Sequence, residues 1–269
     1  MKGEGVPVPS AARLHEFIVV TNEPVACDMW RLVIRAPKLA QTIKPGQFES
    51  FYVPGDPSQI VRIPLSFSAV DKREGTLETI YAVVGDGTRR LSHMKPGDTS
   101  NVLGPCGHGW RVENGASPIL LVAGGVGVTP ILGLARELGS QNIAFDVVLG
   151  ARDKARCWGE AEFIAAGARN VVVTTDDGSY GIAGYASDGV KKLLADTSYR
   201  CLYVCGPEPM MASVAQISHE KELDCQVSLE RMMTCGFGVC ATCNVALAQG
   251  GYASACMDGP VFSAEEVLW

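Results

Sequence analysis

The sequence lacks the features of secreted, membrane-spanning and nucleic-acid-binding proteins. No run reaches the roughly 18 uninterrupted apolar residues of a membrane helix, because glycines and prolines interrupt the most apolar segment, residues 117–135. Residues 1–17 contain no apolar core of a secretory signal, so we expect a cytoplasmic protein. The formal net charge is −6 and the pI is about 5.3, which gives no basic excess for nucleic acid or an anionic membrane.

Charge is also scarce, and cysteine is abundant. Charged residues make up 19% and hydrophobic residues 47% of the 269 residues, a composition that predicts folded domains and is long enough for two. Ten cysteines would indicate a disulfide scaffold only in a short secreted chain. Six are scattered, and we interpret most of them as buried thiols: Cys27, Cys106, Cys157, Cys201, Cys205 and Cys225.

The first part of the chain has the pattern of a β domain. Short β-branched or aromatic runs occur at residues 15–25, 29–37, 46–54, 62–71 and 76–85, separated by turn residues. This spacing is typical of a small barrel or sandwich. Residues 94–110 then read as a Pro-Gly-Asp turn and a glycine-rich loop.

From residue 118 the pattern changes to alternating strands and helices. Apolar strands are expected at residues 118–125, 143–153, 170–179, 200–205 and 225–230, with helices between them. This alternation predicts a parallel sheet covered by helices on both faces. The last stretch, residues 230–269, has loop character and contains four cysteines.

Two strand ends of the α/β part are candidate nucleotide sites. Gly124, Gly125 and Gly127 occupy a strand-to-helix turn, where glycine lets the backbone approach a phosphate. Cys205 and Gly206 end a later strand at the same expected edge of the sheet. Taken alone, the first feature could be an ordinary tight turn and the second a turn with a buried thiol.

The β part carries a candidate phosphate or flavin site. Arg62 offers a bidentate donor and Ser66 a neutral one. Residues 83–92 predict a strand, a Gly-Asp-Gly turn and a short helix with Thr88 as its N-cap, whose amides could receive a pyrophosphate. The alternative is a surface arginine and an ordinary capped helix.

The C-terminal cysteines give the strongest signal. Four residues separate Cys235 from Cys240, two separate Cys240 from Cys243, and twelve more precede Cys256. This is the C-x₄-C-x₂-C…C spacing of plant-type [2Fe–2S] clusters, and small residues between the ligands suit a loop that wraps two irons. Structural zinc usually has two closely spaced pairs, so zinc and buried thiols are the weaker alternatives.

Together these motifs resemble the ferredoxin-reductase superfamily over nearly the whole chain. The shared motifs are Arg-x-x-x-Ser at residues 62–66, Gly-Gly-x-Gly-x-Thr-Pro at 124–130 and Cys-Gly-Pro at 205–207. The segment "ERMMTCGFGVCATC", followed by "ACMDGPVF", resembles the electron-transfer subunits of NAD-linked, heterodimeric (type B) dihydroorotate dehydrogenase. The resemblance implies a β plus α/β fold: an antiparallel flavin-binding β-barrel (residues 1–113), a doubly wound parallel nicotinamide-binding domain (114–229) and a small [2Fe–2S] lobe (230–269).

The resemblance also implies three cofactors, FAD, NAD(H) and a [2Fe–2S] cluster, and their residues. The positions that match FAD-binding residues are Arg62, Pro64, Leu65, Ser66, Gly87 and Thr88. Those that match the nicotinamide side are Gly124, Gly125, Gly127, Thr129, Pro130, Gly206 and Pro207, with Cys205 as the candidate catalytic residue. The cluster ligands match Cys235, Cys240, Cys243 and Cys256. The sequence departs from the family pattern at Ile63, Phe67, Cys106 and His108.

The implied function is electron transfer between NAD(H), FAD and the cluster, to or from an FMN-containing catalytic subunit of pyrimidine biosynthesis, as a heterotetramer. No pattern suggests a pyrimidine site, so we expect the partner to bind the organic substrate. Two alternatives stay open: a reductase subunit of the same build that serves another flavoenzyme or ferredoxin, and a zinc-stabilised nucleotide-binding regulator. NAD and NADP are not distinguished, because Arg152, Lys154 and Arg156 could hold a 2′-phosphate or simply begin a solvated helix, and Asp176 and Asp177 could contact a ribose or form a turn.

Overall fold

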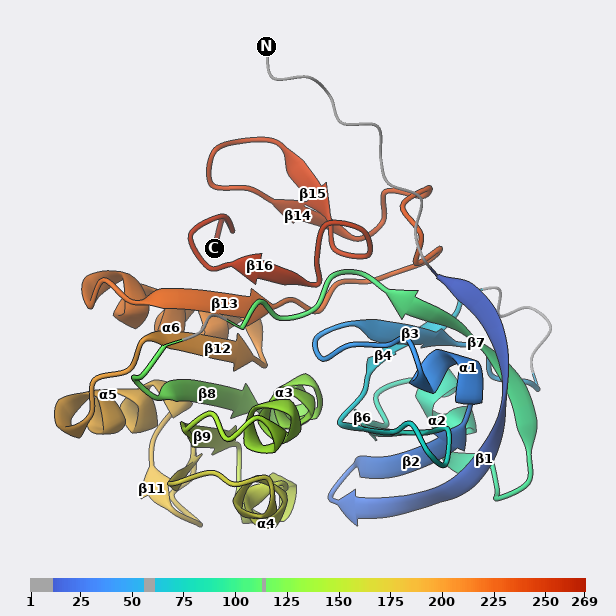
Figure 1. Cartoon of the computed structure of the whole chain (residues 1–269), viewed down its shortest axis with the longest axis horizontal. Helices are drawn as coiled ribbons and strands as arrows, with labels where there is room; N and C mark the ends of the chain where they lie inside the picture. The colour runs from blue at the N-terminus through green and yellow to red at the C-terminus, as the bar shows by residue number, and fades with distance from the viewer. Residues whose placement is uncertain (1–11, 56–60, 113–114) are drawn as a thin grey trace.

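The computed structural model describes residues 12–55, 61–112 and 115–269. Its first part is a curved antiparallel sheet with the strand order β4-β3-β7-β1-β2-β6-β5 (Figure 1). Buried side chains such as Phe17, Leu32, Phe51 and Tyr81 fill its interior. The strands are β1 (Arg13–Ala26), β2 (Met29–Arg35), β3 (Phe48–Phe51), β4 (Ile63–Ser66), β5 (Ala69–Asp71), β6 (Thr76–Ala82) and β7 (Thr99–Cys106), with helices α1 (Pro37–Ala40) and α2 (Asp86–His93).

Strand β7 is a correction to the sequence prediction, which treated this segment as turn and loop. The strand lies between β3 and β1 and pairs antiparallel with both. Its glycine, proline and asparagine residues have low β propensity, and its neighbours on both sides stabilise it through the ladder. The sequence prediction also treated residues 62–71 as a single run, whereas the structure divides this run into two strands, β4 and β5.

The second part is a parallel sheet with helices on both faces, as the alternating pattern predicts. The strand order is β11-β10-β9-β8-β12-β13-β16, in which the edge strand β16 (Val261–Ser263) is antiparallel to β13. Along β8, Ile119 and Leu121 share a core with α3 and α4, whereas Leu120 and Val122 share a core with α5 and α6. The elements are β8 (Ile119–Gly124), β9 (Phe145–Ala151), β10 (Val171–Thr175), β11 (Ile182–Ala183), β12 (Cys201–Cys205), β13 (Asp224–Ser228), α3 (Val128–Ser140), α4 (Glu160–Ala165), α5 (Ala186–Asp196), α6 (Glu208–Glu220) and the 3-10 turns η1 (Gly125–Gly127) and η2 (Lys154–Arg156).

The C-terminal part joins the edge of this sheet. Strand β16 (Val261–Ser263) pairs antiparallel with β13, and a two-stranded ribbon, β14 (Asn244–Ala246) and β15 (Tyr252–Ser254), lies beyond it (Figure 1). Buried Val245, Ala255 and Phe262 belong to the same apolar cluster as Val214 of α6. That cluster extends to Phe48 of the barrel, so the C-terminal part is packed against both larger parts.

Candidate functional site

The two glycine-containing turns predicted to bind a nucleotide lie against each other. They follow β8 and β12, which are neighbours at the point where the strand order reverses. A Cβ atom on Gly127 would lie 2.2 Å from the carbonyl oxygen of Cys205, and one on Gly124 would lie 3.0 Å from Cδ of Pro207. Only glycine permits this approach, and the crevice at a strand-order switch is where open α/β sheets bind ligands.

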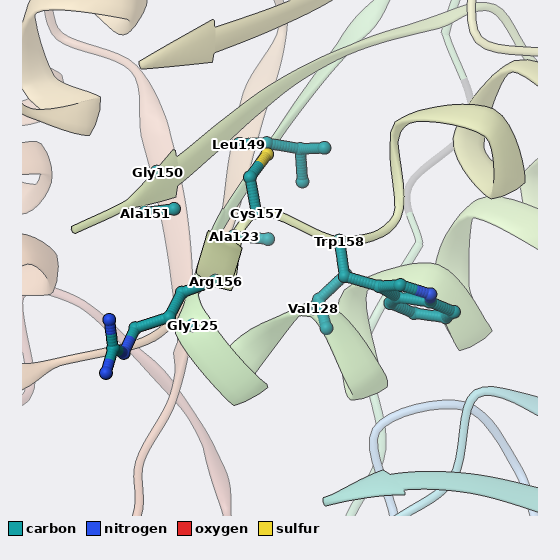
Figure 2. A pocket seen from close by; sticks show the side chains of 9 residues that line it. All are labelled: Ala123, Gly125, Val128, Leu149, Gly150, Ala151, Arg156, Cys157 and Trp158. Carbon is teal, nitrogen blue, oxygen red and sulfur yellow. The ribbon is translucent and has the colours of Figure 1, made fainter. Parts of the chain in front are cut away.

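A pocket opens beside these turns, at the carboxyl ends of β8 and β9 (Figure 2). Gly125 has a φ of +54° and no atom within 4 Å of the position a Cβ would take. The N-termini of α3 and α6 receive no hydrogen bond from a capping side chain, so their amides can bind an anion. The lining residues are Ala123, Gly125, Val128, Leu149, Gly150, Ala151, Arg156, Cys157 and Trp158. Sequence reasoning singled out Gly125 and Arg156 but missed Trp158, whose only sequence signal was an aromatic side chain soon after a strand end.

Cys205, the candidate catalytic residue, ends β12 and is only 2% exposed. Burial and the nearby carboxylate of Glu230 raise the pKa of its thiol. The thiol is therefore neutral at physiological pH and can act as a packing or weak hydrogen-bonding group, but not as a thiolate nucleophile.

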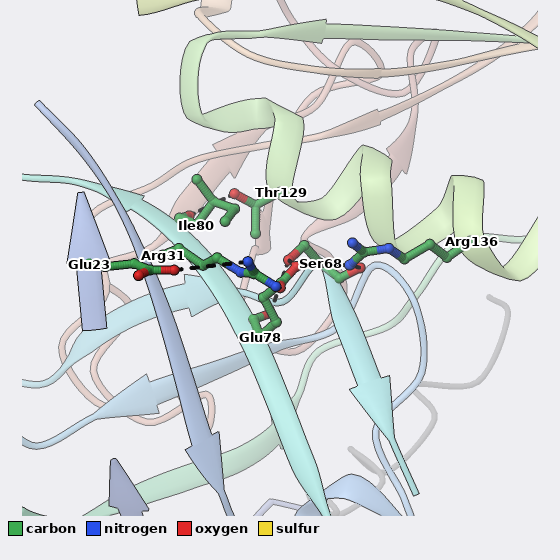
Figure 3. Close-up of polar contacts among 7 residues, drawn as sticks. All are labelled: Glu23, Arg31, Ser68, Glu78, Ile80, Thr129 and Arg136. Carbon is green, nitrogen blue, oxygen red and sulfur yellow. Dashed lines mark hydrogen bonds and ion pairs between the residues drawn. The ribbon is translucent and has the colours of Figure 1, made fainter. Parts of the chain in front are cut away.

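Thr129 connects the α/β part to the barrel. Its side chain is buried, and its hydroxyl donates a hydrogen bond of 2.7 Å to the carbonyl oxygen of Ile80 on β6 (Figure 3). The next residue, Pro130, accepts a hydrogen bond from the indole of Trp110. Thr129 and Pro130, both predicted on the nicotinamide side, therefore hold the start of α3 against β6 and against the segment that contains Trp110.

The predicted flavin motif lies on β4, the edge strand of the barrel. Arg62, just before the strand, donates 2.6 Å and 3.3 Å hydrogen bonds to Oδ1 of Asn101 and the carbonyl oxygen of Ser50. Pro64, Leu65 and Ser66 are half-buried. Helix α3 lies against the end of this motif, because a Cβ on Gly133 would be 2.9 Å from the carbonyl oxygen of Phe67. Asn101, which orients Arg62, was missed because it lies on β7.

Helix α2 forms where the Gly-Asp-Gly turn predicts it, but Thr88 is not its N-cap. The N-cap is Gly85, and Thr88 occupies the third helical position. Its hydroxyl oxygen accepts hydrogen bonds from the amides of Val84 and Gly85. Because glycine has no side chain to cap the helix, the first-turn amides, including that of Gly87, lack a side-chain acceptor, as an anion site requires.

The four C-terminal cysteines form two pairs. The thiols of Cys235 and Cys240 interact, and the amide of Cys256 donates to Sγ of Cys243 at 3.4 Å. Hydrogen bonds from Thr242, then from Cys235, lower the pKa of Cys240 to about 6, which favours the metal-binding thiolate. Within the described ranges, no three His, Cys, Asp or Glu side chains gather as a site for a single metal ion. Together the two pairs supply four thiols, the number that a [2Fe–2S] cluster takes from cysteine.

The cysteine loop lies against the barrel next to the flavin motif. A Cβ on Gly236 would be 3.6 Å from Cδ2 of Leu103 and 4.0 Å from Cβ of Ser50. The carbonyl oxygen of Ser50 is the one that Arg62 contacts. In addition, the amide of His108 donates to the carbonyl oxygen of Gly259. The unusual 106–110 loop therefore supports the C-terminal part, and β3 connects the cysteine loop to the flavin motif.

Comparison with known proteins assigns the chain to a family. A family model for the iron-sulfur cluster binding domain of dihydroorotate dehydrogenase B matches residues 230–268, and an oxidoreductase NAD-binding domain model matches residues 121–216. The dihydroorotate dehydrogenase B (NAD(+)) electron transfer subunit of Desulforamulus reducens is 36% identical over 261 residues, 96% of this chain and 99% of that protein. The chain belongs to this family of electron-transfer subunits. The corresponding subunit of Geobacillus thermodenitrificans is 37% identical over 260 residues, 94% of this chain and 98% of that one.

Solved structures support the same fold. The NADH-dependent reduced ferredoxin-NADP oxidoreductase structure matches with a TM-score of 0.85 and 30% identity, covering 100% of this chain and 92% of that chain. The ferredoxin reductase of carbazole 1,9a-dioxygenase, at 20% identity, a TM-score of 0.68 and coverage of 79% and 67%, shares the fold. The match to an iron–sulfur domain over the cysteine segment confirms an iron–sulfur site over a zinc site. No helix in the described ranges is long and apolar enough to cross a membrane.

Proposed function

We propose that this chain transfers electrons between NAD(H) and an FMN-containing catalytic subunit that oxidises dihydroorotate, using FAD and a [2Fe–2S] cluster bound to its own residues. Two copies of each subunit would form a heterotetramer. None of the ten cysteines forms a disulfide, which suits the reducing cytosol, where we place the protein. The partner would bind the pyrimidine.

The observation that carries the proposal is the position of the flavin motif between the other two sites. On one side, α3, which begins at the nucleotide turns, approaches Phe67 at the end of the motif. On the other side, the cysteine loop approaches Ser50, the residue whose carbonyl oxygen binds Arg62. This order suits electron transfer from a two-electron donor at the nucleotide turns, through a flavin, to a one-electron carrier at the cysteine loop.

The residues of the barrel fit a flavin dinucleotide. Arg62 would bind its phosphates or ring edge, Ser66 would donate to its polar edge, and the uncapped N-terminus of α2 would receive its pyrophosphate. No atom lies within 4 Å of the Cβ position of Gly85, so a phosphate has space to approach. When bound, the flavin would supply the conversion between two-electron hydride transfer and one-electron transfer. The protein's residues orient it and exclude water.

Purification without oxygen, followed by flavin, iron and acid-labile sulfide analysis, tests the proposal. Cys240→Ser should lose the iron and sulfide, whereas Cys27→Ser, which changes an exposed thiol far along the sequence, should keep both. The complex with the co-purifying catalytic subunit should reduce NAD with dihydroorotate. Protein that is correctly folded but lacks flavin, iron and sulfide would contradict the proposal.

A second candidate function is that of a reductase subunit of the same build that serves another flavoenzyme or ferredoxin. The full-length match to a ferredoxin-NADP oxidoreductase structure, at 30% identity, favours it. The co-purifying protein distinguishes the two candidates: a dihydroorotate-oxidising flavoprotein supports the first, and a larger ferredoxin-linked flavoprotein supports the second.

A further inference from the structure

A carboxylic acid, Glu49, lies inside the barrel. Its exposed fraction is 0%. Its Oε1 accepts a 3.2 Å hydrogen bond from the hydroxyl of Thr79 on β6, whereas its Oε2 has no hydrogen-bond partner among the described residues. A buried polar atom without a partner costs stability and is rare in folded proteins. Packing alone does not explain an acid here, because an apolar side chain would fill the same space without that cost.

Glu49 is also a direct neighbour of the flavin motif. In the antiparallel pair of β3 and β4, its register partner is Leu65, the fourth residue of the Arg62–Ser66 motif. Opposite residues of such a pair point to the same face, and Leu65 packs against the core of the barrel. Pro64 and Ser66 alternate to the other face of the strand. A group bound at Pro64 and Ser66 would therefore be separated from the Glu49 carboxyl by about the thickness of a packed sheet, roughly 10 Å.

The elements packed around Glu49 bring neutral side chains to it. Leu39 of α1 lies beside it, because both approach the position that a Cβ on Gly104 of β7 would take. Leu65 of β4 and Thr79 of β6 are neutral as well. Burial raises the pKa of Glu49 to about 8, and the hydrogen bond from Thr79 offsets only part of this effect.

The other ionisable groups nearby keep one charge state. Burial, and then the charge of Glu49, raise the pKa of the Cys106 thiol at the end of β7 to about 12. Burial also raises the pKa of Tyr81, which shares the barrel core. Arg62, which interacts with Cys106, stays a cation. Of these four groups, Glu49 is the one whose charge changes near neutral pH.

We infer that Glu49 takes up a proton from water when the flavin is reduced and releases it when the flavin is oxidised. The inference rests on the proposed function, because it needs a flavin at the Arg62–Ser66 motif. Hydride transfer from NADH delivers two electrons and one proton, and so adds one negative charge to the flavin. An ionised Glu49 on the other face of the sheet repels that charge. Proton uptake converts its carboxylate to a neutral carboxyl and removes the repulsion.

The expected size of this coupling follows from the distance. Two unit charges about 10 Å apart, at an effective dielectric constant of about 20, change an equilibrium constant by about tenfold. At pH 9, where Glu49 is largely ionised while the flavin is oxidised, its charge should disfavour flavin reduction by about fivefold relative to a neutral residue. At about pH 6, Glu49 is protonated in both redox states and should have no effect.

Equilibrium redox titration of the intact, flavin-loaded protein, followed by flavin absorbance, tests the inference. Glu49→Gln should be reduced as readily as the wild type at about pH 6 and about fivefold more readily at about pH 9. Thr79→Val removes a hydrogen bond that lowers the pKa of Glu49, so it should move the wild-type pH dependence to higher pH. Glu74→Gln, which removes an exposed acid of the same barrel, is the control and should follow the wild type.

A second readout detects the proton itself. Infrared difference spectra of the reduced minus the oxidised protein at about pH 8 should contain the C=O band of a newly protonated carboxyl in the wild type. The same band should be absent from Glu49→Gln and present in Glu74→Gln.

Two results in a folded, flavin-loaded Glu49→Gln protein would overturn the inference. The first is the wild-type pH dependence. The second is an equal difference from the wild type at both pH values, which would indicate a structural effect on the flavin site. If Glu49→Gln does not fold, an unmoved pH dependence in Thr79→Val would overturn the inference instead. These results leave the proposed function intact, whereas folded wild-type protein without flavin would contradict the proposed function and this inference with it.

Discussion

Replacing Glu78 should loosen the contact between the barrel and the α/β part. Glu78 lies on β6 with its side chain 7% exposed, and it pairs with Arg31 at 2.5 Å and Arg136 of α3 at 2.8 Å. Ser68 donates a further hydrogen bond at 2.8 Å (Figure 3). Breaking a buried pair costs about 3–5 kcal/mol, but the two arginines are 43% and 34% exposed and can be resolvated. We therefore expect Glu78→Gln to lower the free energy of unfolding by about 2 kcal/mol.

Urea denaturation of the cofactor-loaded protein measures this change. Glu74→Gln is the control, because Glu74 is an exposed acid in the same hairpin. Burial alone would raise the pKa of Glu78, but its bonds to Arg136, Ser68 and Arg31 together lower it. The stabilisation is thus present above the unfolded pKa, near 4.3, and is lost as pH falls below it. A loss under about 0.5 kcal/mol at pH 7, or one that does not shrink at pH 3, would refute the reasoning.

Three further changes have defined outcomes. Gly127→Ala should reduce the urea midpoint and the affinity for ADP-ribose, because its Cβ would lie 2.2 Å from the carbonyl oxygen of Cys205. Thr129→Val leaves the carbonyl oxygen of Ile80 without its donor and should cost about 1–2 kcal/mol in the same assay. Burial raises the pKa of Glu49 to about 8, so wild-type stability should fall as pH rises from about 4.5 to 8, by at most about 1.4 kcal/mol per pH unit. Glu49→Gln should abolish that fall, and urea midpoints at pH 5, 7 and 9 would detect it.

The iron–sulfur and NAD-binding domains could be predicted from sequence because their signals are local patterns. The spacing of Cys235, Cys240 and Cys243 specifies a loop, and the glycines at 124–127 specify a close approach of the backbone. The alternation of strands and helices predicts a parallel sheet with helices on both faces. In each case the residues that carry the signal are near one another along the chain.

The missed features depend on contacts between distant segments. Strand β7 contains residues of low β propensity and exists because β1 and β3 pair with it. Glu78 and Arg136 are 58 positions apart, and an acid in a β run would ordinarily be assigned to a solvent-facing side. Asn101 and Trp158 likewise gain their roles only when the chain is folded.

Strand β6 holds the barrel and the α/β part in a fixed position relative to each other. Glu78 and Ile80 are two residues apart on one face of the strand, and both bind α3, through Arg136 and Thr129. Just past its end, the amide of Val83 binds the tip of the β1–β2 hairpin, which contacts the loop after β9. The α/β part is therefore attached at two separated points, and a rotation between the parts must break at least one of them. The flavin motif and the nucleotide turns lie on opposite sides of this interface. The contacts of β6 with the α/β part therefore fix the distance between them.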